Sequence, residues 1–125
     1  MSLLRVLLVE DSVLLCDRIT EVVHSLPGVQ LAASVSSEAE AVDVLQRGDI
    51  DVVILDLQLK KGTGFGVLRA LRKILKRPSV VVFTNFSLPT YRETALELGA
   101  EHFLDKSRDY ERLPEVLNEI SARHH

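Results

Sequence analysis

The sequence predicts an α/β fold in which five parallel strands form one sheet and five helices cover it. Apolar, β-branched runs alternate strictly with segments of helical periodicity, which is the pattern of consecutive βα units. The first, third and fourth runs each contain four successive apolar residues, as expected for strands that are buried on both faces. A chain of 125 residues has the usual size of one domain, so we expect a single domain over residues 1–125 with a structured core of about 3–122.

The first strand is expected at residues 4–9, and the helix after it should end at Pro27-Gly28. Residues 29–35 form the second strand, and their glutamine, alanine and serine content indicates an edge of the sheet. The next helix should begin at a capping box, because Ser37 is followed three residues later by Glu40, and it should end at Gly48. The apolar face of the first helix is predicted from residues at helical spacing, namely Leu15, Ile19, Val22, Val23 and Leu26.

The second half of the chain continues the alternation. A third strand at residues 52–55 leads to Asp56, a fourth covers 80–83 and a fifth covers 102–104. Pro89 suits the first turn of the fourth helix, which Gly99 should end. The other two helices are predicted from apolar residues at helical spacing, which are Leu68, Leu71 and Leu75 in the third and Leu113, Val116, Leu117 and Ile120 in the fifth.

Charge and composition exclude several classes of protein. The net charge is −3 and the lysines and arginines are scattered, which argues against direct binding of nucleic acid. Hydrophobic residues make up 46% of the chain, yet no apolar stretch approaches the roughly 20 residues that span a membrane. Cys16 is the single cysteine and can form no intramolecular disulfide, and the first residues do not resemble a secretory signal. We therefore expect a cytoplasmic protein that contacts no membrane.

Acidic, hydroxyl and lysine side chains stand at or directly after the ends of four predicted strands. Glu10 and Asp11 follow the first strand, Asp56 follows the third, Thr84 the fourth and Lys106 the fifth. Because the carboxyl ends of parallel strands form one crevice, we expect these groups to lie together. Adjacent carboxylates repel each other unless a cation joins them. The set therefore predicts a site for Mg²⁺ and a phosphoryl group, with one carboxylate as the nucleophile.

Four short motifs give the chain a resemblance to a known family. They are Val9-Glu10-Asp11-Ser12, Ile54-Leu55-Asp56-Leu57 followed by Gly64, Phe83-Thr84, and Phe103-Leu104-Asp105-Lys106. With these motifs in this order, the chain resembles over its whole length the receiver domain of two-component response regulators, in the CheY-like superfamily. The resemblance implies a flavodoxin-like (βα)5 three-layer sandwich with strand order 2-1-3-4-5, in which strands one and three are neighbours.

The resemblance also implies a role for each site residue. Asp56 would accept a phosphoryl group from a phosphohistidine of a sensor kinase or a histidine phosphotransfer protein. Lys106 would neutralise one phosphoryl oxygen, and the Thr84 hydroxyl would donate to another. The cofactor would be Mg²⁺, and its ligands would be Glu10, Asp11, Asp56 and the backbone carbonyl of Gln58.

Phosphorylation is expected to change one surface of the domain. A phosphate adds about −1.5 to −2 of charge and three acceptor oxygens, which would draw the Thr84 hydroxyl inward. Phe103 would then rotate into the space that Thr84 vacates. The changed surface would be helix four, strand five and helix five, where a downstream effector or a second copy of the chain would bind. We expect no enzymatic activity on an external substrate.

Three other interpretations share some of these features. A pseudo-receiver, which serves only as an interaction module, has the same fold and needs no phosphorylation. A haloacid-dehalogenase-like phosphatase also forms an aspartyl phosphate, but its nucleophile lies on the first strand with a second carboxylate two residues later, where this chain has Gln58 after Asp56. A flavodoxin-like flavin binder needs a phosphate-binding loop after the first strand, and Glu10-Asp11 would repel a phosphate there.

Three positions depart from the pattern of the family. Lys60 stands where a proline is often found, Asn85 stands where a small residue is more usual, and Ser107 follows Lys106 in place of the usual proline. The bond before that proline is typically cis in the family, whereas a cis bond before any other residue costs about 2.5–4 kcal/mol. We therefore expect a trans bond between Lys106 and Ser107, and we expect these departures to affect switching more than phosphorylation.

Overall fold

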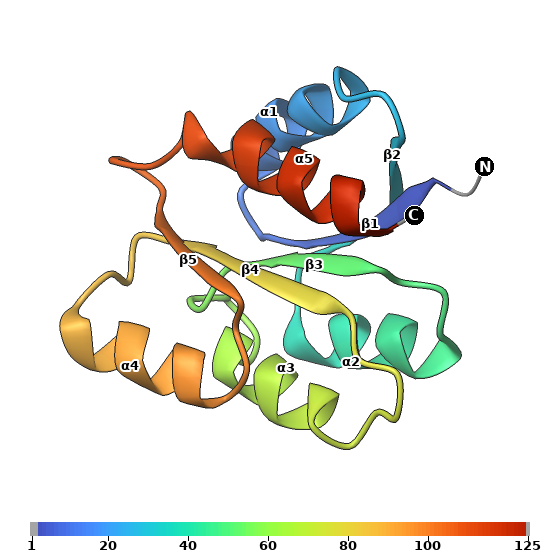
Figure 1. The fold of residues 1–125 in the computed structure, drawn as a ribbon. Helices are drawn as coiled ribbons and strands as arrows, with labels where there is room; N and C mark the ends of the chain where they lie inside the picture. The colour runs from blue at the N-terminus through green and yellow to red at the C-terminus, as the bar shows by residue number, and fades with distance from the viewer. Residues whose placement is uncertain (1–2, 125) are drawn as a thin grey trace.

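The computed structural model describes residues 3–124, and its centre is one sheet of five strands in the order β2-β1-β3-β4-β5 (Figure 1). Every strand is parallel to its neighbours. The predicted fold class and strand order are therefore confirmed, while residues 1, 2 and 125 of the expected domain lie outside the described range. The elements in chain order are β1 (Leu4–Val9), α1 (Val13–His24), β2 (Val29–Val35), α2 (Glu38–Arg47), β3 (Val52–Leu55), α3 (Gly64–Leu71), β4 (Ser79–Thr84), α4 (Pro89–Glu97), β5 (His102–Asp105) and α5 (Arg112–His124).

The helices cover both faces of the sheet. Figure 1 shows α1 and α5 on one face and α2, α3 and α4 on the other. Because successive side chains of a strand point to opposite faces, β1 contributes Val6 and Leu8 to one apolar core and Leu7 and Val9 to the other. The result is the three-layer sandwich that the family resemblance implied.

Burial differs sharply between the centre of the sheet and its β2 edge. All four residues of β3, at the centre of the sheet, are buried. In β2, which forms one edge, Val29 is buried and the other six residues are partly or fully exposed. The sequence therefore predicted correctly which strand lies at the centre of the core and which lies at an edge.

Local signals set most of the helix ends. The Ser37 hydroxyl accepts the N–H of Glu40 at 3.2 Å, so the predicted cap of α2 is present. The Glu40 carboxylate accepts from the Ser37 hydroxyl and from the N–H and hydroxyl of Ser36, and these bonds hold the pKa of Glu40 below its usual value. Pro89 is the first residue of α4, and Gly48 ends α2, both as predicted.

The predicted third helix is too long at its carboxyl end. α3 ends at Leu71, and Leu75, which we expected on its apolar face, is fully exposed. After Leu71 the chain tightens into a turn, because the N–H groups of residues 73 and 74 donate to carbonyls three residues earlier. Ile74 consequently packs against the core, and Leu75 points into solvent.

The pairing of the strands determines which residues meet at the carboxyl edge of the sheet. Val9 at the end of β1 pairs with Leu55 at the end of β3, and the N–H of Asp56 donates to the carbonyl of Val9. On the other side, Thr84 at the end of β4 pairs with Asp105 at the end of β5. Side chains that follow these four strand ends must therefore lie close together.

The burial pattern predicts that two leucine substitutions will differ greatly in their effect on the free energy of unfolding. Leu117 lies on the buried face of α5. Leu117→Ala should lower the free energy of unfolding by about 2–5 kcal/mol, because it removes buried methyl groups and leaves a cavity. Leu75→Ala should change it by less than about 0.5 kcal/mol, since that side chain is exposed. Urea denaturation followed by circular dichroism measures both. A large loss from Leu75→Ala would contradict the end of α3 described above.

Candidate functional site

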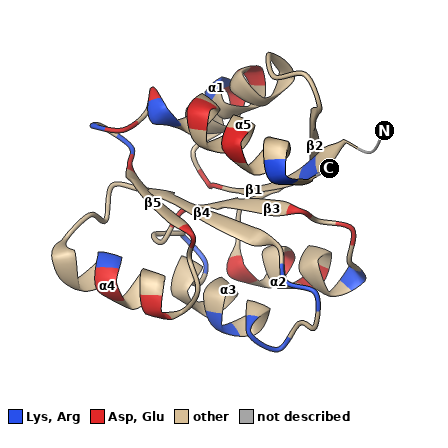
Figure 2. Cartoon of the chain, in the orientation of Figure 1, with Lys and Arg blue, Asp and Glu red and all other residues tan. Residues whose placement is uncertain are grey.

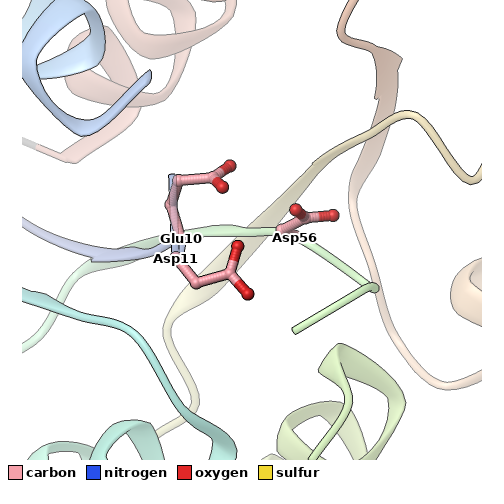
Figure 3. Close-up of side chains that lie close together, drawn as sticks. All are labelled: Glu10, Asp11 and Asp56. Atoms are coloured by element: carbon pink, nitrogen blue, oxygen red, sulfur yellow. The ribbon is translucent and has the colours of Figure 1, made fainter. Parts of the chain in front are cut away.

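Three carboxylates lie together at the carboxyl edge of the sheet. Glu10 and Asp11 follow β1, Asp56 follows β3, and one oxygen of each lies within 4.8 Å of the others (Figure 3). Glu10 is 2% exposed and Asp56 is 5% exposed, whereas Asp11 is partly accessible. The structure thus brings together the three acids that the sequence placed at adjacent strand ends.

Lys106 joins two of these carboxylates. Its Nζ lies 2.6 Å from Glu10 Oε1 and 2.8 Å from Asp56 Oδ2, and its side chain is only 9% exposed. Burial opposes the charged form of the ammonium group, but hydrogen bonds and charge from Asp56 and Glu10 outweigh this effect and raise the pKa of Lys106 above its usual value. Lys106 is therefore a fixed positive charge directed at Asp56.

The second oxygen of Asp56 is also held by donors. The hydroxyl of Thr84 donates to Asp56 Oδ1 at 2.7 Å, and the N–H of Gln58 donates to the same atom at 3.1 Å. Thr84 is fully buried, and its hydroxyl oxygen accepts the N–H of Phe86. Both carboxylate oxygens of Asp56 are thus oriented by neighbours at the carboxyl ends of β3, β4 and β5.

Backbone groups fix the acidic pair after β1. Glu10 Oε2 accepts the N–H of Ser12 at 3.0 Å, and Asp11 Oδ2 accepts the N–H of Lys60 at 2.7 Å. Lys60 belongs to the loop between β3 and α3, so this loop lies against the acids. The hollow at the site has a volume of about 420 Å³, and its lining includes Glu10, Asp11, Asp56, Gln58, Lys60, Asn85 and Lys106.

The residues present fit a hard divalent cation. Glu10, Asp11 and Asp56 supply carboxylate oxygens, which are the ligands that Mg²⁺ prefers, and the adjoining hollow leaves room for the waters that this cation retains. Gln58, whose backbone carbonyl we expected to be a further ligand, lines the same hollow.

Phe103, the expected switch residue, lies away from the hollow. Its side chain is 6% exposed and packs in the core beneath α2, α3 and α4. The guanidinium of Arg92 lies 5.7 Å from the centre of its ring, within the range of a cation–π contact. In this structure the Thr84 hydroxyl is already turned toward Asp56 while Phe103 is buried. The exchange of positions between the two residues stays a prediction.

The turn after β5 explains how Lys106 reaches the site without the family's proline. No peptide bond in the described part of the chain is cis, so the expected trans bond between Lys106 and Ser107 is confirmed. The Asp105 carboxylate accepts the N–H and the hydroxyl of Ser107, at 2.8 and 2.6 Å, and the N–H of Arg108 at 3.1 Å. A proline at position 107 has no N–H to donate, so this turn requires another residue there.

Asp105, which closes the turn that carries Lys106, was assigned no role from the sequence. Its hydrogen bonds, with the Ser107 hydroxyl as the largest contributor, hold its pKa well below the usual range. The signal in the sequence was an aspartate followed two residues later by a serine, because an aspartate side chain often accepts the backbone N–H two residues on.

A family model and curated proteins match this chain. The model described as the response regulator receiver domain matches residues 6–118. The nitrate/nitrite response regulator protein NarP of Escherichia coli (strain K12) is 30% identical over 115 residues, which cover 92% of this chain and 52% of NarP. A protein-glutamate methylesterase/protein-glutamine glutaminase of Treponema denticola is 33% identical over 105 residues, covering 82% of this chain and 28% of that protein. The chain thus spans about half or less of the length of these relatives.

Solved structures are similar to nearly the whole chain. A DNA-binding response regulator of the LuxR family from Staphylococcus aureus superposes with a TM-score of 0.86 at 25% identity, covering 95% of this chain and 99% of that one. The response regulator domain of CheB from Thermotoga maritima gives a TM-score of 0.85 at 22% identity, with 96% and 95% of the two chains covered. At 22% identity, the similarity to the CheB domain shows a shared fold only.

The low pKa of Asp105 predicts a pH-dependent effect of Asp105→Ala. A depressed pKa means that the ionised carboxylate stabilises the fold at pH values above its ordinary pKa, and that this contribution is lost as the pH falls below about 4. The loss of unfolding free energy caused by Asp105→Ala should therefore be larger at about pH 6 than at about pH 3. Urea denaturation at several pH values measures it, with exposed Glu97→Ala as the control. A loss that is the same at every pH would contradict the assigned hydrogen bonds.

Proposed function

The chain belongs to the response regulator receiver domain family, and from this we propose that Asp56 accepts a phosphoryl group from a phosphohistidine of a sensor kinase or a histidine phosphotransfer protein. The observation that carries the proposal is the setting of the Asp56 carboxylate, which lies between the Lys106 ammonium and the Thr84 hydroxyl and beside two further acids. We further propose that residues 1–125 act as one receiver domain, with a core of about 3–122, and have no external substrate.

The chemistry that we propose is an in-line displacement at phosphorus. A carboxylate oxygen of Asp56 forms a bond to phosphorus as the bond from phosphorus to the histidine nitrogen breaks, and the leaving imidazole keeps the electron pair. The demands on the protein are positioning and neutralisation of charge. Lys106 and Thr84 already donate to the two oxygens of Asp56, so small shifts would let them donate to phosphoryl oxygens instead.

A cation completes the proposed site. Glu10, Asp11, Asp56 and the backbone carbonyl of Gln58 would hold Mg²⁺, which would neutralise the negative charge on the phosphoryl oxygens. Without a cation, Lys106 supplies one positive charge against three carboxylates. The excess of negative charge favours the binding of a divalent cation at this site.

The partners that we propose follow from the same chemistry. A phosphorylated domain would act on a downstream effector, or on a second copy of the chain, through the surface of α4, β5 and α5. Thr84 ends β4 just before α4, and Phe103 lies in β5, so both candidate switch residues belong to elements of this surface or adjoin it. Within residues 3–124 no helix has the length and apolar character needed to cross a membrane. We propose a cytoplasmic location without direct contact to nucleic acid or membrane.

The position of Lys106 favours this proposal over a pseudo-receiver. A lysine turned to solvent would have favoured an interaction module without phosphorylation, whereas Lys106 contacts Asp56 at 2.8 Å. The phosphatase alternative has little support, because Asp56 follows β3 instead of β1 and Gln58 stands where a second carboxylate would be needed.

Labelling with acetyl phosphate in the presence of Mg²⁺ tests the proposal directly. Wild-type protein should gain one phosphoryl group, Asp56→Asn should gain none, and Asp11→Ala should be labelled at least about tenfold more slowly, because it loses a carboxylate that would hold the cation. Intact-mass spectrometry measures the labelling, and Glu97→Ala, which removes an exposed acid that does not line the hollow, is the matched control.

Peptide mapping gives the outcome that would overturn the assignment. A phosphoryl group found on a residue other than Asp56 in the wild-type protein would refute the phosphoacceptor role. Equal labelling of Asp11→Ala and Glu97→Ala, in folded samples, would refute the role of the acidic pair in binding the cation.

A further inference from the structure

The loop between β3 and α3 is held at its far end by Glu38, the first residue of α2. Glu38 Oε1 accepts the N–H of Thr63 at 2.9 Å, and the backbone N–H of Glu38 donates to the carbonyl of Lys61 at 3.1 Å. α2 and α3 lie side by side on the same face of the sheet (Figure 1), and Figure 2 shows acidic residues on α2. With these two hydrogen bonds, Glu38 contacts the loop between β3 and α3 through both its side chain and its backbone.

Two glycines make room for the Glu38 side chain. A Cβ atom on Gly62 would clash with Glu38 Cβ, and a Cβ on Gly66 would clash with both carboxylate oxygens of Glu38. Gly62 also has a φ of +84°, in the left-handed region that favours glycine. The carboxylate lies at the amino end of α3, where the helix dipole favours a negative charge. Glu38 is thus packed closely against the loop and the first turn of α3.

The near end of the same loop borders the candidate cation site. The N–H of Lys60 donates to Asp11, and the N–H of Gln58 donates to Asp56. Both residues line the hollow, whereas Glu38 does not. The backbone from 58 to 63 is therefore fixed at one end by two of the site carboxylates and at the other end by Glu38.

We propose that Glu38 is a positioning residue, which holds the backbone of Gln58 and Lys60 against Asp56 and Asp11 and so sets the affinity of the site for Mg²⁺. The inference rests on the proposed function. Glu38 touches none of the site carboxylates, so it acts only through the loop. When Glu38 is removed, the loop loses its anchor at Thr63, and the backbone at residues 58 and 60 samples positions that suit the cation less well.

The first test compares Glu38→Ala with Glu38→Gln, which keeps an acceptor oxygen, and with Asp43→Ala, which removes an exposed acid from the same helix. Glu38→Ala should weaken Mg²⁺ binding about tenfold by calorimetry, a typical effect of losing a residue that orients metal ligands. The amides of Lys60 and Thr63 should exchange faster with solvent in this variant. The Mg²⁺ affinity and amide exchange rates of Glu38→Gln should lie closer to those of the wild type. Asp43→Ala should have the wild-type values.

Labelling by acetyl phosphate separates positioning from a direct chemical role. The rate for Glu38→Ala should fall at low Mg²⁺ and return to nearly the wild-type rate at saturating Mg²⁺. A rate that stays low at saturation, or wild-type Mg²⁺ affinity and amide exchange in Glu38→Ala, would overturn the proposal.

A second test uses Gly66→Ala, because the added methyl group should push the Glu38 carboxylate away without removing it. Gly66→Ala should lower the unfolding midpoint of the wild-type protein but leave it unchanged or raise it in the Glu38→Ala background, since alanine suits a helix better than glycine. If Gly66→Ala changed the unfolding midpoint equally in the wild type and in Glu38→Ala, the close contact between Gly66 and the Glu38 carboxylate would be contradicted. Calorimetry, amide exchange and this comparison need no phosphorylation, so they still decide the role of Glu38 if wild-type Asp56 is not labelled.

Discussion

Repulsion among three carboxylates is the constraint on which the rest of the structure depends. Glu10 and Asp56 lie next to each other because β1 and β3 are paired, and both are almost fully buried. Buried charges are tolerated only when they are paired and hydrogen bonded. Lys106 meets this demand by contacting both acids with one ammonium group. The loop that carries Lys106 is therefore as important to the site as the strands that carry the acids.

The loops on both sides of the site are held by backbone hydrogen bonds at two positions where the sequence departs from the family pattern. After β5, Asp105 closes a turn with the N–H and hydroxyl of Ser107, which delivers Lys106 through a trans bond. After β3, Lys60 stands where the family often has a proline, and its N–H is used by Asp11. In each case a residue that departs from the family pattern donates a backbone hydrogen bond that proline could not make.

The sequence was sufficient to predict the sheet and to predict that the site residues lie together, because both depend on local patterns repeated along the chain. Apolar runs predicted the strands, and the residues after those runs had to meet at one edge. Leu75 was placed wrongly because helical spacing continues past Leu71 although the backbone turns there. The contact of Glu38 with Thr63 was missed because it joins residues 25 apart, and no local pattern reports such a contact.

The pKa of Lys106 is the most direct measure of the charge balance at the site. It can be followed through the side-chain carbon next to Nζ by nuclear magnetic resonance during a pH titration, in the wild-type protein and in Asp56→Asn. The two carboxylates should hold the pKa of Lys106 above its usual value in the wild type, and the loss of one of them should lower it in the variant. An ordinary pKa in the wild type, unchanged by Asp56→Asn, would contradict the pairing of Lys106 with Asp56.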